Sequence, residues 1–398
     1  MKTKILTFAL FLFTAATVIG YPLIKDKPDN TVKPIGNILP QSDKPKIEVV
    51  FVLDTTGSMG GLIQSAKEKI WSIASTMASA QSAPEIKMGL VAYRDRGDAY
   101  VTKVVDLSSD LDSMYATLMD FKANGGGDGP ESVNQALYDA VHEISWSEDQ
   151  DTYKVVFMVG DAPPHTDYQN DVQYPVTAKV AQGKGILINT IQCGIDQNTK
   201  VQWQQIAQLG GGDYFQVDQA GSAVAVVTPY DEKLAELSEK IEDTRLYFGN
   251  KAEKLAQSMK REATDKLRKL SSAASLARRA EFNSSDSGKA NMYGKNELVG
   301  SISSGTIDLS DIDADDLPEP MKAMTLEEQE SLIEEKAVQR KELDRQILAA
   351  TEQRRDYLKN KAKEAGGYKD SLDEKIYSTV KKQAEKKGFI YKADAPAY

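Results

Sequence analysis

Cysteine, histidine and long basic runs are scarce in this chain of 398 residues, and each scarcity excludes a class of protein. Cys193 is the single cysteine, so no intramolecular disulfide can form; it ends an apolar run and is expected to be buried. Lys and Arg total 49 against 59 Asp and Glu, a formal net charge of −10. Without a basic run, no nucleic acid is expected as a partner, because phosphate backbones are bound by clustered cationic side chains.

Sequence patterns typical of catalysis are also missing. The chain has no Gly-x-Ser-x-Gly nucleophile elbow, no His-Glu-x-x-His zinc motif and no Gly-Lys-Ser/Thr phosphate loop. With only two histidines in the sequence, a general base would have to be a carboxylate. These gaps favour a binding protein over an enzyme.

The N-terminus has the order of a secretory signal peptide. A short positively charged start precedes the apolar run 5–19, and small residues and a proline-containing polar stretch follow. The run is shorter than the ~20 residues that span a bilayer, which favours cleavage between Ala16 and Tyr21. We therefore predict a signal peptide over 1–20 and a periplasmic or secreted protein. An uncleaved N-terminal membrane anchor is the alternative.

Strands alternate with helices between residues 46 and 229. Two runs, 47–53 and 155–159, are continuously apolar, as expected of strands buried on both faces of a sheet. The alternation predicts an α/β domain with a doubly wound, mostly parallel sheet. Further strands are predicted at 86–93, 100–105, 185–192 and 212–217, and helices at 58–80, 111–121, 130–141, 171–182 and 201–209.

The flanking regions have a different pattern. Residues 21–45 lack apolar periodicity, which indicates a linker. Apolar residues recur every three or four positions over 230–280, which predicts a long amphipathic helix that Gly249 and Asn250 break or kink. Ser, Gly and Asp over 281–324 predict a loop. A capping box at Thr325 opens a second helical region over 325–392. We expect a partly coiled-coil C-terminal region, capable of self-association.

Three short segments place oxygen ligands at predicted strand ends or helix entries. The first strand ends in Asp54, and Thr56 and Ser58 lie on the turn that follows, where alternate side chains can converge on one ion. Asp128 follows three glycines before a predicted helix, and Asp161 follows the second buried strand. Hard oxygen ligands suit Mg²⁺, with Ca²⁺ or Mn²⁺ also accepted. The sequence therefore predicts a divalent metal site at the carboxyl edge of the sheet.

Each segment alone has a simpler explanation. Asp54 and Asp128 could cap the helices that follow them, and Asp161 could be a turn residue. The occurrence of all three, in this order, favours the metal site. His165 is expected to close its proline-rich loop by a hydrogen bond, with metal binding as the alternative. Asp95 either supports the site from outside the ligand set or belongs to a solvated, salt-bridged loop.

Segment 50–59, Val-Phe-Val-Leu-Asp-Thr-Thr-Gly-Ser-Met, resembles the metal-ion-dependent adhesion site (MIDAS) motif Asp-x-Ser-x-Ser of von Willebrand factor A domains. Segments 125–131 and 160–165 resemble the second and third metal loops of the bacterial and extracellular-matrix relatives. The resemblance covers 46–229 and implies an exported bacterial protein whose Rossmann-like domain binds a partner protein through the ion. It assigns Asp54, Thr56 and Ser58 to the first loop, Asp128 to the second and Asp161 to the third.

Two departures from the family pattern affect the expected use of the ion. Adhesion-type domains usually carry threonine in the second loop; Asp128, as a third carboxylate, would weaken the ion's pull on a partner's acidic side chain. Gly60 and Gly61 stand where the accessory site of integrin β subunits needs aspartates, so that site is not expected.

We therefore expect an exported, metal-dependent protein-binding module that serves in adhesion or as a scaffold. Two alternatives stay open. One is a metal-assisted hydrolase of the phosphatase type, although Thr56 stands where phosphatases with Asp-x-Asp-x-Thr carry their general acid. The other is a mainly structural coiled-coil protein with the α/β domain as its scaffold.

Overall fold

The computed structural model describes residues 44–81, 83–217, 226–364 and 372–391. The predicted signal peptide and nearly all of the predicted linker lie outside these residues. Among the helices that are described, none has both the length and the apolar character needed to cross a membrane.

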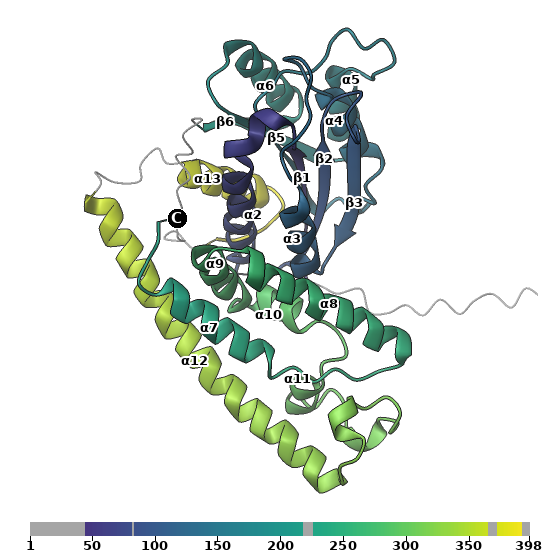
Figure 1. Ribbon diagram of the computed structural model, residues 1–398, viewed down its shortest axis with the longest axis vertical. Coiled ribbons are helices and arrows are strands. Elements are labelled where there is room, and N and C mark those ends of the chain that lie inside the picture. The colour runs from purple at the N-terminus through teal and green to yellow at the C-terminus, as the bar shows by residue number, and fades with distance from the viewer. Residues whose placement is uncertain (1–43, 82, 218–225, 365–371, 392–398) are drawn as a thin grey trace, which may run out of the picture. The chain divides into compact units, whose positions relative to one another are not determined.

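A six-stranded sheet with the order β3-β2-β1-β4-β5-β6 forms the centre of the α/β domain (Figure 1). Neighbouring strands run parallel except β2 and β3, which are antiparallel, so the predicted doubly wound, mostly parallel sheet is confirmed. Strand order reverses between β1 and β4, and the loops after these two strands diverge at their carboxyl ends. The strands are β1 (Lys46–Asp54), β2 (Glu85–Tyr93), β3 (Thr102–Ser108), β4 (Tyr153–Gly160), β5 (Ile186–Cys193) and β6 (Gly211–Val217).

Helices cover both faces of the sheet, and successive residues of β1 enter different cores. Phe51 packs in a core with residues of α2 and α3, whereas Val52 packs in a second core with residues of α4, α5 and α6. This double burial explains the continuous apolar run of β1. Cys193, at the end of β5, is a buried free thiol as predicted. The helices are α2 (Ile63–Ala78), α3 (Leu111–Asp120), α4 (Val133–His142), α5 (Tyr174–Gly183) and α6 (Gln197–Leu209).

Four predicted helix starts are displaced by at least three residues: α5 begins at Tyr174 instead of residue 171, α6 begins at Gln197 instead of residue 201, and the other two lie in the loops that carry predicted metal ligands. The helix expected from Ser58 begins as a short 3₁₀ turn, η1 (Gly57–Gly61), before α2. The helix expected from Pro130 begins at Val133 because Glu131 is held elsewhere: its N–H donates to the Pro163 carbonyl at 2.9 Å. The residues before α4 therefore pair with the loop after β4.

The long helix predicted over 230–280 is three helices: the predicted break at Gly249 and Asn250 is confirmed, and a second break at Ser271 and Ser272 was not predicted. α7 (Asp231–Glu242) and α8 (Lys251–Leu270) are separated at Gly249, whose φ of +127° favours glycine, and α8 opens with a capping box at Asn250. The Ser272 hydroxyl accepts from the Ser275 N–H and starts α9 (Ala273–Asn283).

The prediction of a loop over 281–324 was wrong in part, because this stretch contains two helices and two 3₁₀ turns. They are α10 (Asp286–Tyr293), α11 (Leu298–Ser303), η2 (Leu309–Asp311) and η3 (Glu319–Met321).

The C-terminal helices pack against the α/β domain and against each other. Phe282 of α9 and Val380 of α13 (Leu372–Glu385) belong to the core that contains α2. From α13, Gln383 accepts from the Tyr153 hydroxyl of β4 at 2.8 Å and donates to Asn189 of β5 at 2.9 Å. The longest helix, α12 (Leu326–Glu364), lies beside α7 and also contacts α9 and α11. Within the described residues, the C-terminal helical region is thus joined to the α/β domain by a shared core.

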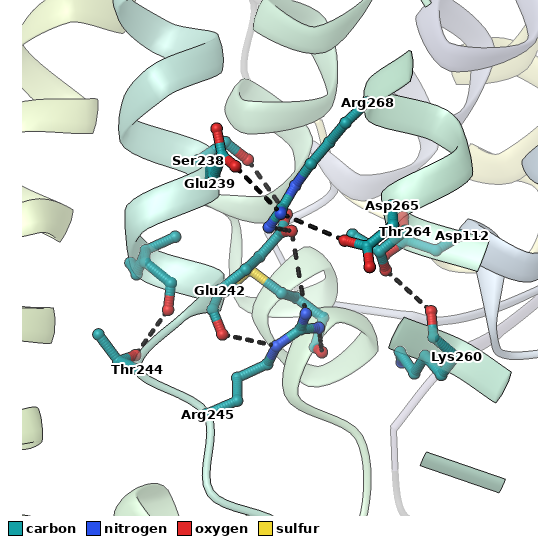
Figure 2. A network of polar contacts seen from close by, with 12 residues as sticks. Asp112, Ser238, Glu239, Glu242, Thr244, Arg245, Lys260, Thr264, Asp265 and Arg268 are labelled. Carbon is teal, nitrogen blue, oxygen red and sulfur yellow. Dashed lines mark hydrogen bonds and ion pairs between the residues drawn. The ribbon is translucent and has the colours of Figure 1, made fainter. Parts of the chain in front are cut away.

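A network of polar contacts joins α3 of the α/β domain to α7 and α8 (Figure 2), and Arg279 of α9 pairs with two buried carboxylates of this network. Arg279 donates to both Asp112 carboxylate oxygens, at 2.7 and 2.6 Å, and also pairs with Glu242. The Asp112 carboxylate accepts in addition from the Thr264 hydroxyl at 3.2 Å. Burial alone would raise the pKa of Asp112, but Arg279 holds it well below its usual range. The network therefore holds charged groups in a region that excludes water.

Candidate metal centre

Asp54 is the last residue of β1 and is completely buried. Parallel neighbours on both sides bring the strand end into the middle of the sheet's carboxyl edge. Its Oδ1 accepts from the Thr56 N–H at 2.8 Å and from the Thr56 hydroxyl at 2.6 Å. One carboxylate oxygen is thereby fixed by the turn that follows the strand.

A line of oxygens runs from Asp54 to the loop after β4. The Thr56 hydroxyl lies 3.1 Å from the Ser58 hydroxyl, and the Ser58 hydroxyl donates to Asp161 Oδ1 at 2.9 Å. Four of the five predicted ligands, Asp54, Thr56, Ser58 and Asp161, are thus linked by hydrogen bonds. The contact between Ser58 and Asp161 spans 103 residues of sequence and depends on β1 and β4 being neighbours.

The second oxygen of Asp54, Oδ2, is buried and has no hydrogen-bond partner. An unpaired carboxylate oxygen in a water-free position is costly unless a cation compensates it. Gly160 keeps space beside it: a Cβ there would lie 3.0 Å from Asp54 Oδ2 and would collide with the Tyr93 hydroxyl. The donor set is one of carboxylate and hydroxyl oxygens, so it fits a hard divalent ion.

Electrostatics of the site favour a bound cation. Burial raises the pKa of Asp54 to about 7, against the lowering effect of its hydrogen bonds from Thr56, and the nearby charge of Asp161 raises it further. Burial likewise raises the pKa of Asp161. These carboxylates repel one another when ionised, and a divalent ion would relieve that repulsion.

Glu131 is a member of this site that the sequence prediction missed. Its side chain is buried, its Oε2 has no hydrogen-bond partner, and burial together with the charge of Asp54 raises its pKa to about 9. A Cβ on Gly126 would lie 3.0 Å from Glu131 Oε1 and 3.3 Å from Thr56 Cβ, so the carboxylate approaches the first metal loop. The one signal in the sequence was an additional acid in the same glycine-rich segment as Asp128.

Asp128, the fifth predicted ligand, lies in a different local environment. Its Oδ1 is 3.4 Å from His165 Nε2, and 64% of its side chain is exposed. It lines a pocket of about 480 Å³ together with Ser58 and Asp161, although the hydrogen bonds that connect the other four predicted ligands do not include it. Coordination of the same ion by Asp128 stays a prediction.

His165 closes its proline-rich loop as predicted. Its Nδ1 lies 2.7 Å from Asp167 Oδ1, and its backbone N–H donates to the Glu131 carbonyl at 3.1 Å. Asp95 is buried rather than solvated, since it accepts from the Ser132 hydroxyl at 2.9 Å and from the Tyr168 hydroxyl at 2.9 Å. Asp95 and His165 are thus both buried in the loops at the carboxyl edge of the sheet.

Residues 48–224 match the family model described as von Willebrand factor A domain. A putative ariadne-like RING finger protein of Acanthamoeba polyphaga mimivirus is 27% identical over 119 residues, which is 30% of this chain and 11% of that protein. Alpha-protein kinase vwkA of Dictyostelium discoideum is 27% identical over 126 residues, 31% of this chain and 20% of that protein. The matched part of the chain thus spans a fifth or less of these relatives.

Solved structures with a similar fold include proximal thread matrix protein 1 from the mussel byssus, in a form with a zinc-occupied MIDAS motif. It is 16% identical, with a TM-score of 0.36 over 44% of this chain and 42% of that one. The SpRpn10 VWA domain is 14% identical, with a TM-score of 0.35 over 46% of this chain and 96% of that one.

Proposed function

We propose that the von Willebrand factor A domain matched at residues 48–224 binds a divalent cation and uses it to bind a protein partner. The observation that carries the proposal is the buried, unpartnered Oδ2 of Asp54 at one end of a line of oxygens. Asp54, Thr56, Ser58 and Asp161 would hold the ion, with Glu131 beside them. When bound, the ion would neutralise the buried carboxylates and offer a coordination position to an acidic group of the partner.

Mg²⁺ is the ion we propose, with Ca²⁺ or Mn²⁺ as alternatives, because carboxylate and hydroxyl oxygens are hard ligands. Ser58 is exposed and lines the pocket of about 480 Å³, so the ion would be reached from that side. The pocket walls carry Asp128, Glu131, Asp161 and Asp196. A partner that placed a single carboxylate on the ion would meet these acids, so complementary basic groups around that carboxylate would strengthen binding.

We propose a binding role rather than catalysis. Support comes from the arrangement of the oxygens, whose hydrogen bonds order one another around a cation position. We also propose export by the N-terminal signal peptide, tested by locating the mature N-terminus in cell fractions. Self-association through the C-terminal helices is a further expectation, tested by light scattering of the purified protein.

The metal proposal is tested by calorimetric titration of the full chain with Mg²⁺, Ca²⁺ and Mn²⁺. The full chain is needed because Phe282 and Val380 complete the core that contains α2. Asp54→Asn keeps the size of the side chain but removes its charge, and we expect it to weaken binding at least tenfold. Asp196→Asn is the matched control: Asp196 lines the same pocket but accepts from the Thr199 N–H at 2.7 Å, a cap that asparagine can also make.

Partner binding is tested next, by affinity capture from an envelope fraction with and without chelator. A partner retained only in the presence of the ion, and lost with Asp54→Asn, supports the proposed function. Failure of the unmutated protein to bind any of the three ions would contradict it.

A further inference from the structure

A second group of potential metal ligands lies at the same edge of the sheet and consists of Asp95, Asp128 and His165. One ligand atom from each of the three residues lies within 4.8 Å of the others. His165 Nε2 is 3.4 Å from Asp95 Oδ2 and 3.4 Å from Asp128 Oδ1. The three residues come from the loops after β2, before α4 and after β4, so the fold assembles the group from distant segments.

The imidazole of His165 is buried and its Nε2 has no hydrogen-bond partner. At 3.4 Å from each carboxylate, Nε2 is beyond the 2.7–2.9 Å typical of a charge-assisted hydrogen bond. Ligand atoms about 2.0–2.2 Å from a tetrahedral zinc ion are about 3.3–3.5 Å apart, which matches both separations. Both separations from His165 Nε2 therefore suit an ion that it shares with the two carboxylates.

The surroundings hold the ring in the orientation that a metal ligand needs. Asp167 Oδ1 lies 2.7 Å from Nδ1, so Nδ1 carries the proton in the neutral ring and Nε2 keeps its lone pair. The ring also stacks on Tyr168, with centroids 3.9 Å apart and an interplanar angle of 12°. The opposite carboxylate is fixed as well, because Asp95 accepts from the hydroxyls of Ser132 and Tyr168.

The geometry points to a second metal site, at which His165 Nε2, Asp95 and Asp128 bind a zinc-type divalent ion. One nitrogen and two carboxylate oxygens suit Zn²⁺ better than Mg²⁺, which prefers oxygen ligands alone. The exposed side chain of Asp128 closes the site on its solvent side, and a fourth coordination position is left for water or a partner group. In this assignment Asp128 belongs to the zinc-type site and not to the ion held at Asp54.

Co²⁺, a spectroscopic substitute for Zn²⁺, tests the proposal on the full chain. Tetrahedral Co²⁺ absorbs visible light far more strongly than octahedral Co²⁺, so an ion at the all-oxygen site gives only weak bands. We expect strong bands that Zn²⁺ abolishes by displacement, and loss of these bands in His165→Ala. Asp128→Asn is expected to weaken binding at least tenfold, and Asp167→Asn about 10–100-fold.

Two controls separate this proposal from the function proposed above. His142→Ala replaces the other histidine of the sequence and is expected to leave the bands unchanged. Asp54→Asn is also expected to keep the bands, while His165→Ala keeps Mg²⁺ binding. Asp128 and Asp167 are mostly exposed, with 64% and 72% of their side chains accessible, so their variants keep the fold even where His165→Ala does not. Strong bands that survive Asp128→Asn unchanged, or no strong bands in the unmutated protein, would overturn the proposal.

Discussion

Replacement of Arg279 by methionine is expected to destabilise the protein strongly. Arg279 is 2% exposed, and it pairs with two buried carboxylates, Asp112 from α3 and Glu242 from α7. Methionine fills a similar volume but leaves Asp112 without its ion-pair partner, whereas Glu242 keeps its ion pair with Arg268 at 2.6 Å. Removal of one member of a buried ion pair typically costs about 3–5 kcal/mol, because the remaining charge stays buried and uncompensated. At about 2–4 °C per kcal/mol, the melting temperature should fall by roughly 6–20 °C.

Trp71 offers a local readout for this experiment. Its ring lies 5.6 Å from that of Phe282 in α9 and 4.9 Å from that of Tyr115 in α3, so its fluorescence reports on the region that Arg279 stabilises. Urea unfolding is followed by fluorescence and circular dichroism. The matched control is Arg345→Met: this side chain is 71% exposed and pairs with Glu342 three residues earlier, so we expect its replacement to leave the urea midpoint nearly unchanged.

The pH dependence of the Arg279→Met effect has a definite sign. In the unmutated protein the pKa of Asp112 lies below its usual value of 3.8, so its stabilising contribution is present above that pH and is lost only as the pH falls toward the folded pKa. In the variant the unpaired, buried carboxyl should have a raised pKa, and protonation should relieve part of its cost. The difference between the two proteins should therefore shrink from pH 7 to pH 5. A loss under about 1 kcal/mol at pH 7, or a difference that grows on acidification, would refute this reasoning.

Other predictions concern the metal centre and the shared core. Because the folded pKa of Asp54 is raised to about 7, the metal-free protein should lose stability as the pH rises from 4 through 7, and Asp54→Asn should reduce that loss in thermal melts with chelator. Mg²⁺ at 100 times its dissociation constant should stabilise the protein by about 2.7 kcal/mol, measured as a shift in the urea midpoint that Asp54→Asn removes. Gly126→Ala places a Cβ 3.0 Å from Glu131 Oε1 at a φ of +77°, and should cost roughly 1–3 kcal/mol and weaken Mg²⁺ binding in calorimetry; unchanged affinity would contradict the placement of Glu131. Phe282→Ala should cost about 3–5 kcal/mol in urea unfolding, and a loss under 1 kcal/mol would contradict the shared core.

The central strands could be predicted because strands buried on both faces have a continuous apolar run in the sequence. β1 and β4 contribute to cores on both faces of the sheet, so nearly every residue is apolar. Asp54 and Asp161 were found for the same reason, since each directly follows such a run. After residue 230, Gly249 and Asn250 indicated the first helix break, whereas the break before α9 was missed because the apolar spacing continues across Ser272, where a local cap restarts the helix.

The remaining parts of the site depend on contacts that no local pattern encodes. Glu131 approaches the metal loop because its backbone pairs with Pro163 and Pro164. That pairing also explains why α4 starts three residues later than the proline suggested. The grouping of Asp128 with His165 likewise follows from how two loops, 37 residues apart in sequence, lie against each other.

Packing of α13 against the sheet has a consequence for how the protein can be made. Gln383 joins Tyr153 and Asn189, which precede it by 230 and 194 residues, and Phe389 lies in the same core as β1. A ribosome releases the chain from its N-terminus, so the earliest strands emerge long before the residues that complete their core. The α/β domain therefore completes its core only after the segment that contains Gln383 and Phe389 has left the ribosome.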